Sequence, residues 1–98
     1  MAGIDTLLRA MLSARASDLH LTADQPPRIR VDGSMKNLGD QVIPRETLRK
    51  LLEEIAPANI WAEFVEAKDA DFAYELPTLA RFRANYFRDI SGRGAVFR

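Results

Sequence analysis

The chain has 98 residues, of which 47% are apolar and 29% are charged, with a formal net charge of zero and no cysteine. This length suits one domain, and the apolar content is too high for a disordered chain. The absence of cysteine excludes disulfides, thiolate zinc sites and a cysteine nucleophile. No apolar run approaches the roughly 20 residues that cross a bilayer, and no cleavable signal architecture opens the chain, so we expect a soluble, cytoplasmic protein.

The zero net charge conceals three blocks of different sign. Residues 1–52 carry a net charge of +2, residues 53–75 of −6, and residues 81–98 of +4. The last block holds five arginines and no lysine. Because the planar guanidinium group binds phosphate or carboxylate with two parallel hydrogen bonds, this arginine-rich end is the first candidate for a binding function.

The first half of the chain predicts one helix and three short strands. Residues 4–13 predict an amphipathic helix, because apolar side chains recur there with helical spacing: Ile4, Leu7, Leu8, Met11 and Leu12. Residues 17–21 and 28–32 alternate between apolar and polar side chains, as half-buried strands do. Asp32-Gly33 then predicts a hairpin turn into a return strand near residues 35–38.

The second half predicts two helices followed by three strands. Helices are expected over residues 44–55 and 60–67, with Pro57 between them. Residues 71–75 and 80–88 alternate as strands, and a polar turn over residues 89–94 leads to a last strand over 95–98. The order of elements predicts an α+β fold with about six strands in a mostly antiparallel sheet and three helices.

The strand over residues 80–88 separates apolar from basic side chains. Its apolar face carries Phe82, Ala84 and Tyr86, and its polar face carries Arg81, Arg83 and Asn85. Arg81 and Arg83 are expected about 7 Å apart, and Arg98 would approach them if the last strand pairs with this one. Either an anion lies among these like charges, or their long stems cover the sheet and keep their charged ends in water. The residues alone favour neither alternative.

The anion itself has several candidate sources: a nucleotide phosphate, carboxylates of another domain, or a nucleic-acid backbone. Nucleic acid is the weakest of them, because the chain is neutral and the basic end offers few exposed aromatic side chains for base stacking. A nucleotide phosphate needs only two or three arginines, so it fits better. We therefore expect no nucleic-acid partner.

No other motif predicts catalysis. The single histidine, His20, shares a strand face with Asp18. The two would act as a general base or metal ligands, or simply hydrogen-bond across the surface of the sheet or to a partner domain. We favour the hydrogen bond, because zinc takes three or four protein ligands. The glycines form no phosphate-binding GxxxxGK[ST] loop, so nucleotide hydrolysis by this chain alone is not expected.

Four segments of the sequence together carry a specific family pattern. They are ASDLHL at residues 16–21, PPRIRVDG at 26–33, ARFRAN at 80–85 and GRGAVFR at 92–98. In order and spacing they resemble the N-terminal domain of the type IV pilus retraction (twitching-motility) ATPases, within the secretion ATPase superfamily. One departure is Asp24, where the family commonly has glycine, and we expect it to affect only the loop.

The resemblance implies a PAS-like domain that precedes a RecA-like motor domain in a homohexamer. It implies that Arg83 and Arg98, with Arg81 as a lesser candidate, contact the phosphates of ATP held with Mg²⁺ by the motor domain. The partners would be the motor domains of its own and the neighbouring subunit, and the pilus machinery at the inner membrane. The Walker motifs of the family lie in the motor domain, so this chain is expected to be a non-enzymatic part of an ATP-hydrolysing protein.

Two further expectations concern the extent of the chain and a rival function. Val96-Phe97-Arg98 carries no terminating turn, cap or polar tail, which favours a piece of a longer protein whose residues 1–98 are a single domain. The rival is a stand-alone PAS-like sensory or adaptor module that binds a small ligand or a protein. A buried polar pocket would favour the sensor, whereas Arg83 and Arg98 side by side and exposed would favour the motor-associated domain.

Overall fold

The computed structural model describes residues 2–90 and 92–98 and contains three helices and six strands in these residues. In chain order the elements are α1 (Ile4–Ser13), β1 (Asp18–Thr22), β2 (Arg28–Val31), β3 (Ser34–Asn37), α2 (Arg45–Ile55), α3 (Ala58–Ala67), β4 (Asp69–Leu76), β5 (Ala80–Asp89) and β6 (Gly92–Phe97). The predicted α+β fold, with three helices and a six-stranded sheet, is confirmed.

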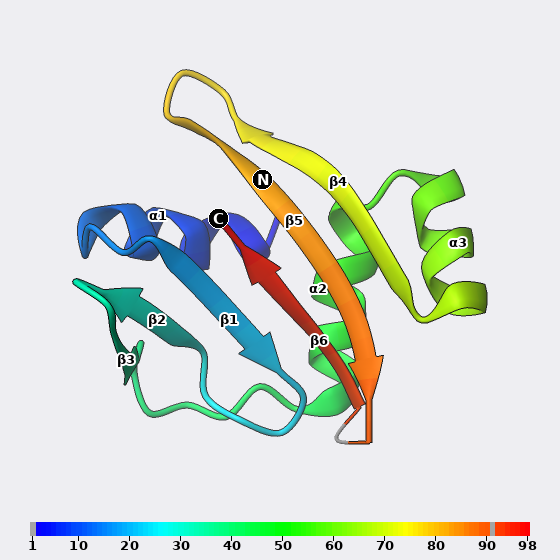
Figure 1. Cartoon of the computed structure of the whole chain (residues 1–98), viewed down its shortest axis with the longest axis horizontal. Coiled ribbons are helices and arrows are strands. Elements are labelled where there is room, and N and C mark those ends of the chain that lie inside the picture. The colour runs from blue at the N-terminus through cyan, green and yellow to red at the C-terminus, as the bar shows by residue number, and fades with distance from the viewer. Residues whose placement is uncertain (1, 91) are drawn as a thin grey trace.

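The strands form one sheet in the order β3-β2-β1-β6-β5-β4, and each neighbouring pair is antiparallel. The last strand of the chain therefore lies in the middle of the sheet, between β1 and β5 (Figure 1). The chain enters the sheet as the β1-β2-β3 meander, leaves it for α2 and α3, and returns through β4 and β5. As a result, β1, from the start of the chain, and β6 and β5, from its end, are neighbours at the centre of the sheet.

Strand β6 begins earlier than expected. The sequence predicts a turn over residues 89–94, but β5 continues to Asp89 and β6 starts at Gly92, while Ser91 lies outside the described residues. Gly94 pairs with Phe87 within the ladder, and a Cβ atom on Gly94 would lie only 2.5 Å from the Phe87 ring. The glycine that resembles a turn residue in the sequence therefore lets a ring lie against the backbone of a strand.

All three helices pack against one face of the sheet. Tyr86, on the apolar face of β5, is fully buried, and its ring contacts the rings of Trp61 and Phe64 on α3. The same core includes Ile4 and Leu8 of α1. In Figure 1, α2 passes behind β5 and β6, and α3 lies beside β4. Among the described residues, no helix covers the opposite face of the sheet.

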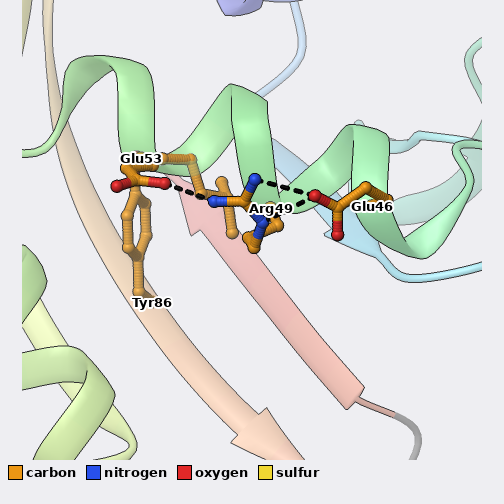
Figure 2. A network of polar contacts seen from close by, with 5 residues as sticks. Glu46, Arg49, Glu53 and Tyr86 are labelled. Atoms are coloured by element: carbon orange, nitrogen blue, oxygen red, sulfur yellow. Dashed lines mark hydrogen bonds and ion pairs between the residues drawn. The ribbon is translucent and has the colours of Figure 1, made fainter.

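The hydroxyl group of Tyr86 also stabilises the end of α2. It donates a hydrogen bond to the carbonyl oxygen of Leu52 at 2.8 Å, and Leu52 is among the last four residues of the helix, whose carbonyls have no partner inside it. Figure 2 shows Tyr86 reaching α2 from the sheet, while Arg49 bonds to Glu46 and Glu53 along the solvent side of the helix. Burial raises the pKa of Tyr86, so the phenol remains a donor.

The start of α2 is held by Asp24, which lies 21 residues earlier. The backbone N–H of Arg45 donates to Asp24 Oδ1 at 3.1 Å, and the Arg45 guanidinium group donates to Oδ2. Asp24 has φ of 65°, in the left-handed region, which explains why glycine suits this position in the family pattern. The expectation that Asp24 affects only the loop is wrong, because its carboxylate caps a helix.

A buried acid on α1 controls the ionisation of a tyrosine on β4. Tyr74 donates a hydrogen bond of 2.6 Å to Oδ1 of Asp5, and Asp5 is the only charged residue in the core of the described part of the chain. Burial, together with the hydrogen bond to Asp5 and its charge, raises the pKa of Tyr74 to about 12. The raised pKa stabilises the fold fully below about pH 10, and this contribution is lost as the pH rises to about 12.

Asp5→Asn is expected to lower the pKa of Tyr74 while leaving it above 10, since the burial that is its largest cause remains. The ultraviolet absorbance of tyrosinate, followed during alkaline titration, measures the shift. Asp71→Asn is the control, because Asp71 accepts a hydrogen bond from Asn85 and does not contact Tyr74. An unchanged titration curve in the Asp5 variant would contradict the assigned coupling.

Candidate functional site

The open face of the sheet carries two arginines that lie directly opposite one another. The backbone of Arg83 donates to the carbonyl oxygen of Arg98 at 2.8 Å, and the backbone of Arg98 donates back to Arg83 at 3.0 Å. Residues that exchange both bonds have Cα atoms about 5.5 Å apart and project from the same face. The predicted pairing of the two arginine-bearing strands is confirmed, and both side chains are exposed, with 56% of the Arg98 side chain accessible.

Arg81 is set apart from this pair. It lies two residues before Arg83 on the same face of β5, and its partner across the ladder is Glu75 of β4. Arg83, by contrast, lies opposite Ala73. Arg81 therefore has an acidic neighbour in its own row, whereas Arg83 has an uncharged residue on one side and Arg98 on the other. The structure brings together Arg83 and Arg98 and places Arg81 at the margin.

A single row of side chains crosses the sheet at this point. The β1–β6 register pairs Leu19 with Phe97, so the preceding and following residues, Asp18 and Arg98, also lie opposite each other. On its other side, Asp18 pairs with Arg30 of β2. The row thus reads Arg30, Asp18, Arg98 and Arg83, with one negative and three positive charges. Its excess positive charge lies at the Arg98 and Arg83 end.

Besides Arg30, Asp18 is the residue of this row that the sequence pattern does not assign to the arginine site. Its Oδ2 atom lies 3.5 Å from Nε of Arg98 and 3.8 Å from Nε of Arg30. No spacing in the sequence indicates this contact, because Asp18 and Arg98 come from opposite ends of the chain. The only available signal is that Asp18 faces outward in a strand pattern, which does not say which strand lies beside it.

Asp18 is ionised in the folded protein. Its burial favours the neutral acid, but a hydrogen bond from Ser17 and the charge of Arg98, followed by contacts with His20, outweigh this and hold the pKa of Asp18 below its usual value. Because the pKa is lowered by folding, the stabilisation is present above about pH 4 and is lost as the pH falls through the folded pKa. Asp18 therefore remains a carboxylate that can accept from Arg98 at neutral pH.

His20 differs from its expected role. Its Nε2 atom lies 3.5 Å from Asp18 Oδ2, but it is buried and forms no hydrogen bond with the described residues. The two side chains thus lie side by side on the strand face as expected, but no hydrogen bond joins them in the described residues. Within residues 2–90 and 92–98, no group of three or more metal-ligating side chains surrounds this pair.

The described residues also form a groove on the helical side of the molecule. It has a volume of about 630 Å³ and opens to solvent. Its lining is mainly apolar and includes Leu7, Pro27, Leu38, Val42, Ile43 and Leu51. This groove is therefore not the buried polar pocket that would favour a sensory module.

Comparisons with known proteins agree with the pattern in the sequence. No protein-family model matches the chain. The chain is 39% identical over 95 residues to the type IV pilus retraction ATPase PilT of Pseudomonas aeruginosa, covering 97% of the chain and 28% of that protein. It is 32% identical over 72 residues to a twitching motility protein of Neisseria gonorrhoeae, covering 74% of the chain and 19% of that protein. The chain thus spans less than a third of the length of these relatives.

Solved structures show the same relationship. The pilus retraction motor PilT, crystallised with bound ADP, matches the whole chain with a TM-score of 0.86 and 30% identity, over 29% of its own length. The ATPase DotB of Legionella pneumophila matches 97% of the chain with a TM-score of 0.85 over 27% of its length, and at 23% identity it shows the fold alone. Over its whole length, therefore, the chain is homologous to the N-terminal domain of the pilus retraction ATPases.

Proposed function

We propose that this chain is a single N-terminal domain of a longer ATPase that retracts type IV pili, and that Arg83 and Arg98 contact phosphates of ATP held by a RecA-like motor domain. The observation that carries the proposal is the exposed pair of directly opposed arginines on an open sheet face. Its support from comparison is the 39% identity to PilT and the match to a PilT structure with bound ADP. Arg81 is the lesser candidate, because Glu75 lies beside it.

The chemistry of the pair fits a phosphate group. Like charges directly opposite each other on neighbouring strands destabilise a sheet unless an anion lies between them. Asp18 compensates only the Arg98 side, so Arg83 keeps its full positive charge. Each guanidinium group presents N–H donors in a plane, which matches the spacing of phosphate oxygens.

The pair would act as a sensor of phosphate rather than as a catalyst. Bound ATP supplies the phosphate oxygens, and its accompanying Mg²⁺ would be held by the motor domain. Arg83 and Arg98 would draw this domain toward the motor domain through charge-assisted hydrogen bonds. Loss of a phosphate would remove acceptors, weaken the contact and let the domains rotate apart. The chain alone is then not an enzyme, and hydrolysis belongs to the whole protein.

The assembly implied by this proposal is a homohexamer. The domain would contact the motor domains of its own and the neighbouring subunit, and the ring would act on the pilus machinery as a cytoplasmic protein peripheral to the inner membrane. In the described part of the chain, none of the helices has the length and apolar character needed to span a membrane. The sensory alternative has no support, because the groove on the helical side is open and apolar.

The proposal is tested by the affinity of the full-length protein for ATP. Arg98→Ala is expected to weaken ATP binding about tenfold or more, because a hydrogen bond to a charged group contributes about 1.5–3 kcal/mol. Isothermal titration calorimetry with a non-hydrolysable ATP analogue measures the change. Arg28→Ala is the matched control, since Arg28 is exposed on the same sheet face but lies on β2, opposite His20. Equal affinity in the wild type and the Arg98 variant would contradict the proposal.

A further inference from the structure

The row of charges across the sheet contains one acid, and that acid holds one of the two phosphate-site candidates. Only 14% of the Asp18 side chain is exposed, compared with 56% of the Arg98 side chain. Oδ2 of Asp18 lies 3.5 Å from Nε of Arg98, the nitrogen nearest to the aliphatic stem. The carboxylate thus contacts the base of the guanidinium group and leaves the Nη atoms at its outer end for another acceptor.

We infer that Asp18 is a positioning residue for Arg98: it orients the guanidinium group so that its two Nη atoms face a phosphate group. The inference rests on the proposed contact of Arg98 with ATP. Asp18 itself would not touch the nucleotide. It acts through Arg98 alone and has no direct part in the contact made by Arg83.

Asp18 is suited to this role because two further side chains, those of Arg30 and His20, also contact its carboxylate. Arg30 lies 3.8 Å from Oδ2 and is itself tied to the β2–β3 turn, where its Nη1 atom donates to the carbonyl oxygen of Gly33 at 3.1 Å. On the other side, Nε2 of His20 lies 3.5 Å from the same oxygen. Asp18 is the first residue of β1, and its carboxylate lies between Arg98 and the anchored side chain of Arg30, so it is held in place beside Arg98.

The gain from this arrangement is entropic. A free arginine side chain has many rotamers, and ordering it on binding costs about 0.5–1.5 kcal/mol. Because Asp18 already orders Arg98 in the unbound protein, the entropic cost of ordering that side chain no longer lowers the affinity for phosphate. The positive charge of Arg98 near Arg83 is also partly offset in the absence of ligand, which reduces the repulsion between the two strands.

A double-mutant cycle in the full-length protein tests the inference. Asp18→Ala is expected to weaken the binding of the non-hydrolysable ATP analogue about three- to tenfold, which corresponds to the ordering of one long side chain. In an Arg98→Ala background, the same change is expected to alter affinity by less than about twofold, because the residue through which Asp18 acts is absent. Asp71→Ala is the matched control: Asp71 lies on the same face but bonds to Asn85.

The outcomes separate this inference from the proposed function. If Arg98→Ala alone leaves ATP affinity unchanged, the proposed function fails and the role of Asp18 fails with it. If Arg98→Ala weakens binding but Asp18→Ala does not, or if the two losses add in the double variant, only the positioning role is overturned. Tighter binding by Asp18→Ala would also overturn it, since the acid would then merely repel the phosphates.

A second measurement does not depend on nucleotide or on assembly. In the 98-residue chain, the Nε nuclear magnetic resonance signal of Arg98 is expected to change its chemical shift in Asp18→Asn, which keeps the side-chain shape without the charge, because the Asp18 carboxylate lies 3.5 Å from Nε. The signal of Arg83, which has no carboxylate opposite it, is the internal control. An Arg98 signal at the same chemical shift in wild type and variant would overturn the assigned contact.

Discussion

Replacing Arg83 with alanine is expected to lower kcat/KM for ATP hydrolysis by the full-length protein about ten- to a hundredfold, and to slow pilus retraction, while the fold remains intact. The physical reason is that Arg83 is the uncompensated charge of the row: Ala73 lies on one side of it and Arg98 on the other. A charged hydrogen bond to phosphate contributes about 1.5–3 kcal/mol, and each 1.4 kcal/mol corresponds to a factor of ten. The measurement is steady-state ATP turnover.

Arg81→Ala supplies the matched comparison for Arg83→Ala. Both arginines are exposed and lie on the same face of the same strand, so loss of a long basic side chain is common to the two variants. Because Glu75 lies opposite Arg81, we expect a change of less than about threefold for this variant. Unchanged turnover in Arg83→Ala, or equal losses in both variants, would argue against a specific role for the Arg83–Arg98 pair.

Replacing Tyr86 with alanine is expected to have the largest effect on folding, a loss of about 3–5 kcal/mol in the free energy of unfolding. The side chain is fully buried and makes edge contacts with the rings of Trp61, Phe64, Phe72 and Phe97, which join α3 to three strands of the sheet. Because domains of this size are stable by only about 5–15 kcal/mol, the variant would lose a large part of its stability. Chemical denaturation of the chain measures the loss.

Tyr86→Phe separates the hydrogen bond from the packing. It keeps the ring contacts but leaves the carbonyl oxygen of Leu52 without its donor, at an expected cost of about 1–3 kcal/mol. Each kcal/mol lowers the melting temperature of a domain of this size by about 4–8 °C. Tyr74→Phe is the comparison, because it also removes one hydroxyl group but leaves the buried Asp5 carboxylate, rather than a helix carbonyl, without its donor. A stability of Tyr86→Phe equal to the wild type would show that the helix end needs no such donor.

Much of the secondary structure could be predicted from the sequence because elements such as α1 and β5 bury one face and expose the other. The helical spacing of Ile4, Leu8 and Met11 matches the residues of α1 that are buried, and the alternation of Phe82, Ala84 and Tyr86 matches the buried face of β5. The spacing of apolar residues along the sequence reflects which face of an element is buried, so it predicts the element even when its neighbours are unknown. The start of β6 was predicted less accurately, because Gly92 and Gly94 indicate a turn in the sequence but belong to the strand in the structure.

Half of the candidate site followed from the same pattern. Alternation placed Arg81 and Arg83 on the face opposite the core, and the short connection after residue 88 favoured pairing with the last strand, which brings Arg98 near them. A hairpin requires only local information, because its two strands are adjacent in the sequence. The distinction between Arg83 and Arg81 did not follow, because it depends on whether Ala73 or Glu75 lies opposite.

The sequence by itself determined the elements, their buried faces and, through four short segments, the family. Only the tertiary structure decided that β6 lies between β5 and β1 and that Asp18 therefore meets Arg98, although 80 residues separate them. The physical reason is that pairing between distant strands depends on how the whole sheet closes over its helices, and a strand pattern does not specify its neighbour. The neutral total charge of the sequence thus includes, in the fold, a row in which Asp18 lies between Arg30 and Arg98 and Arg83 lies beyond Arg98.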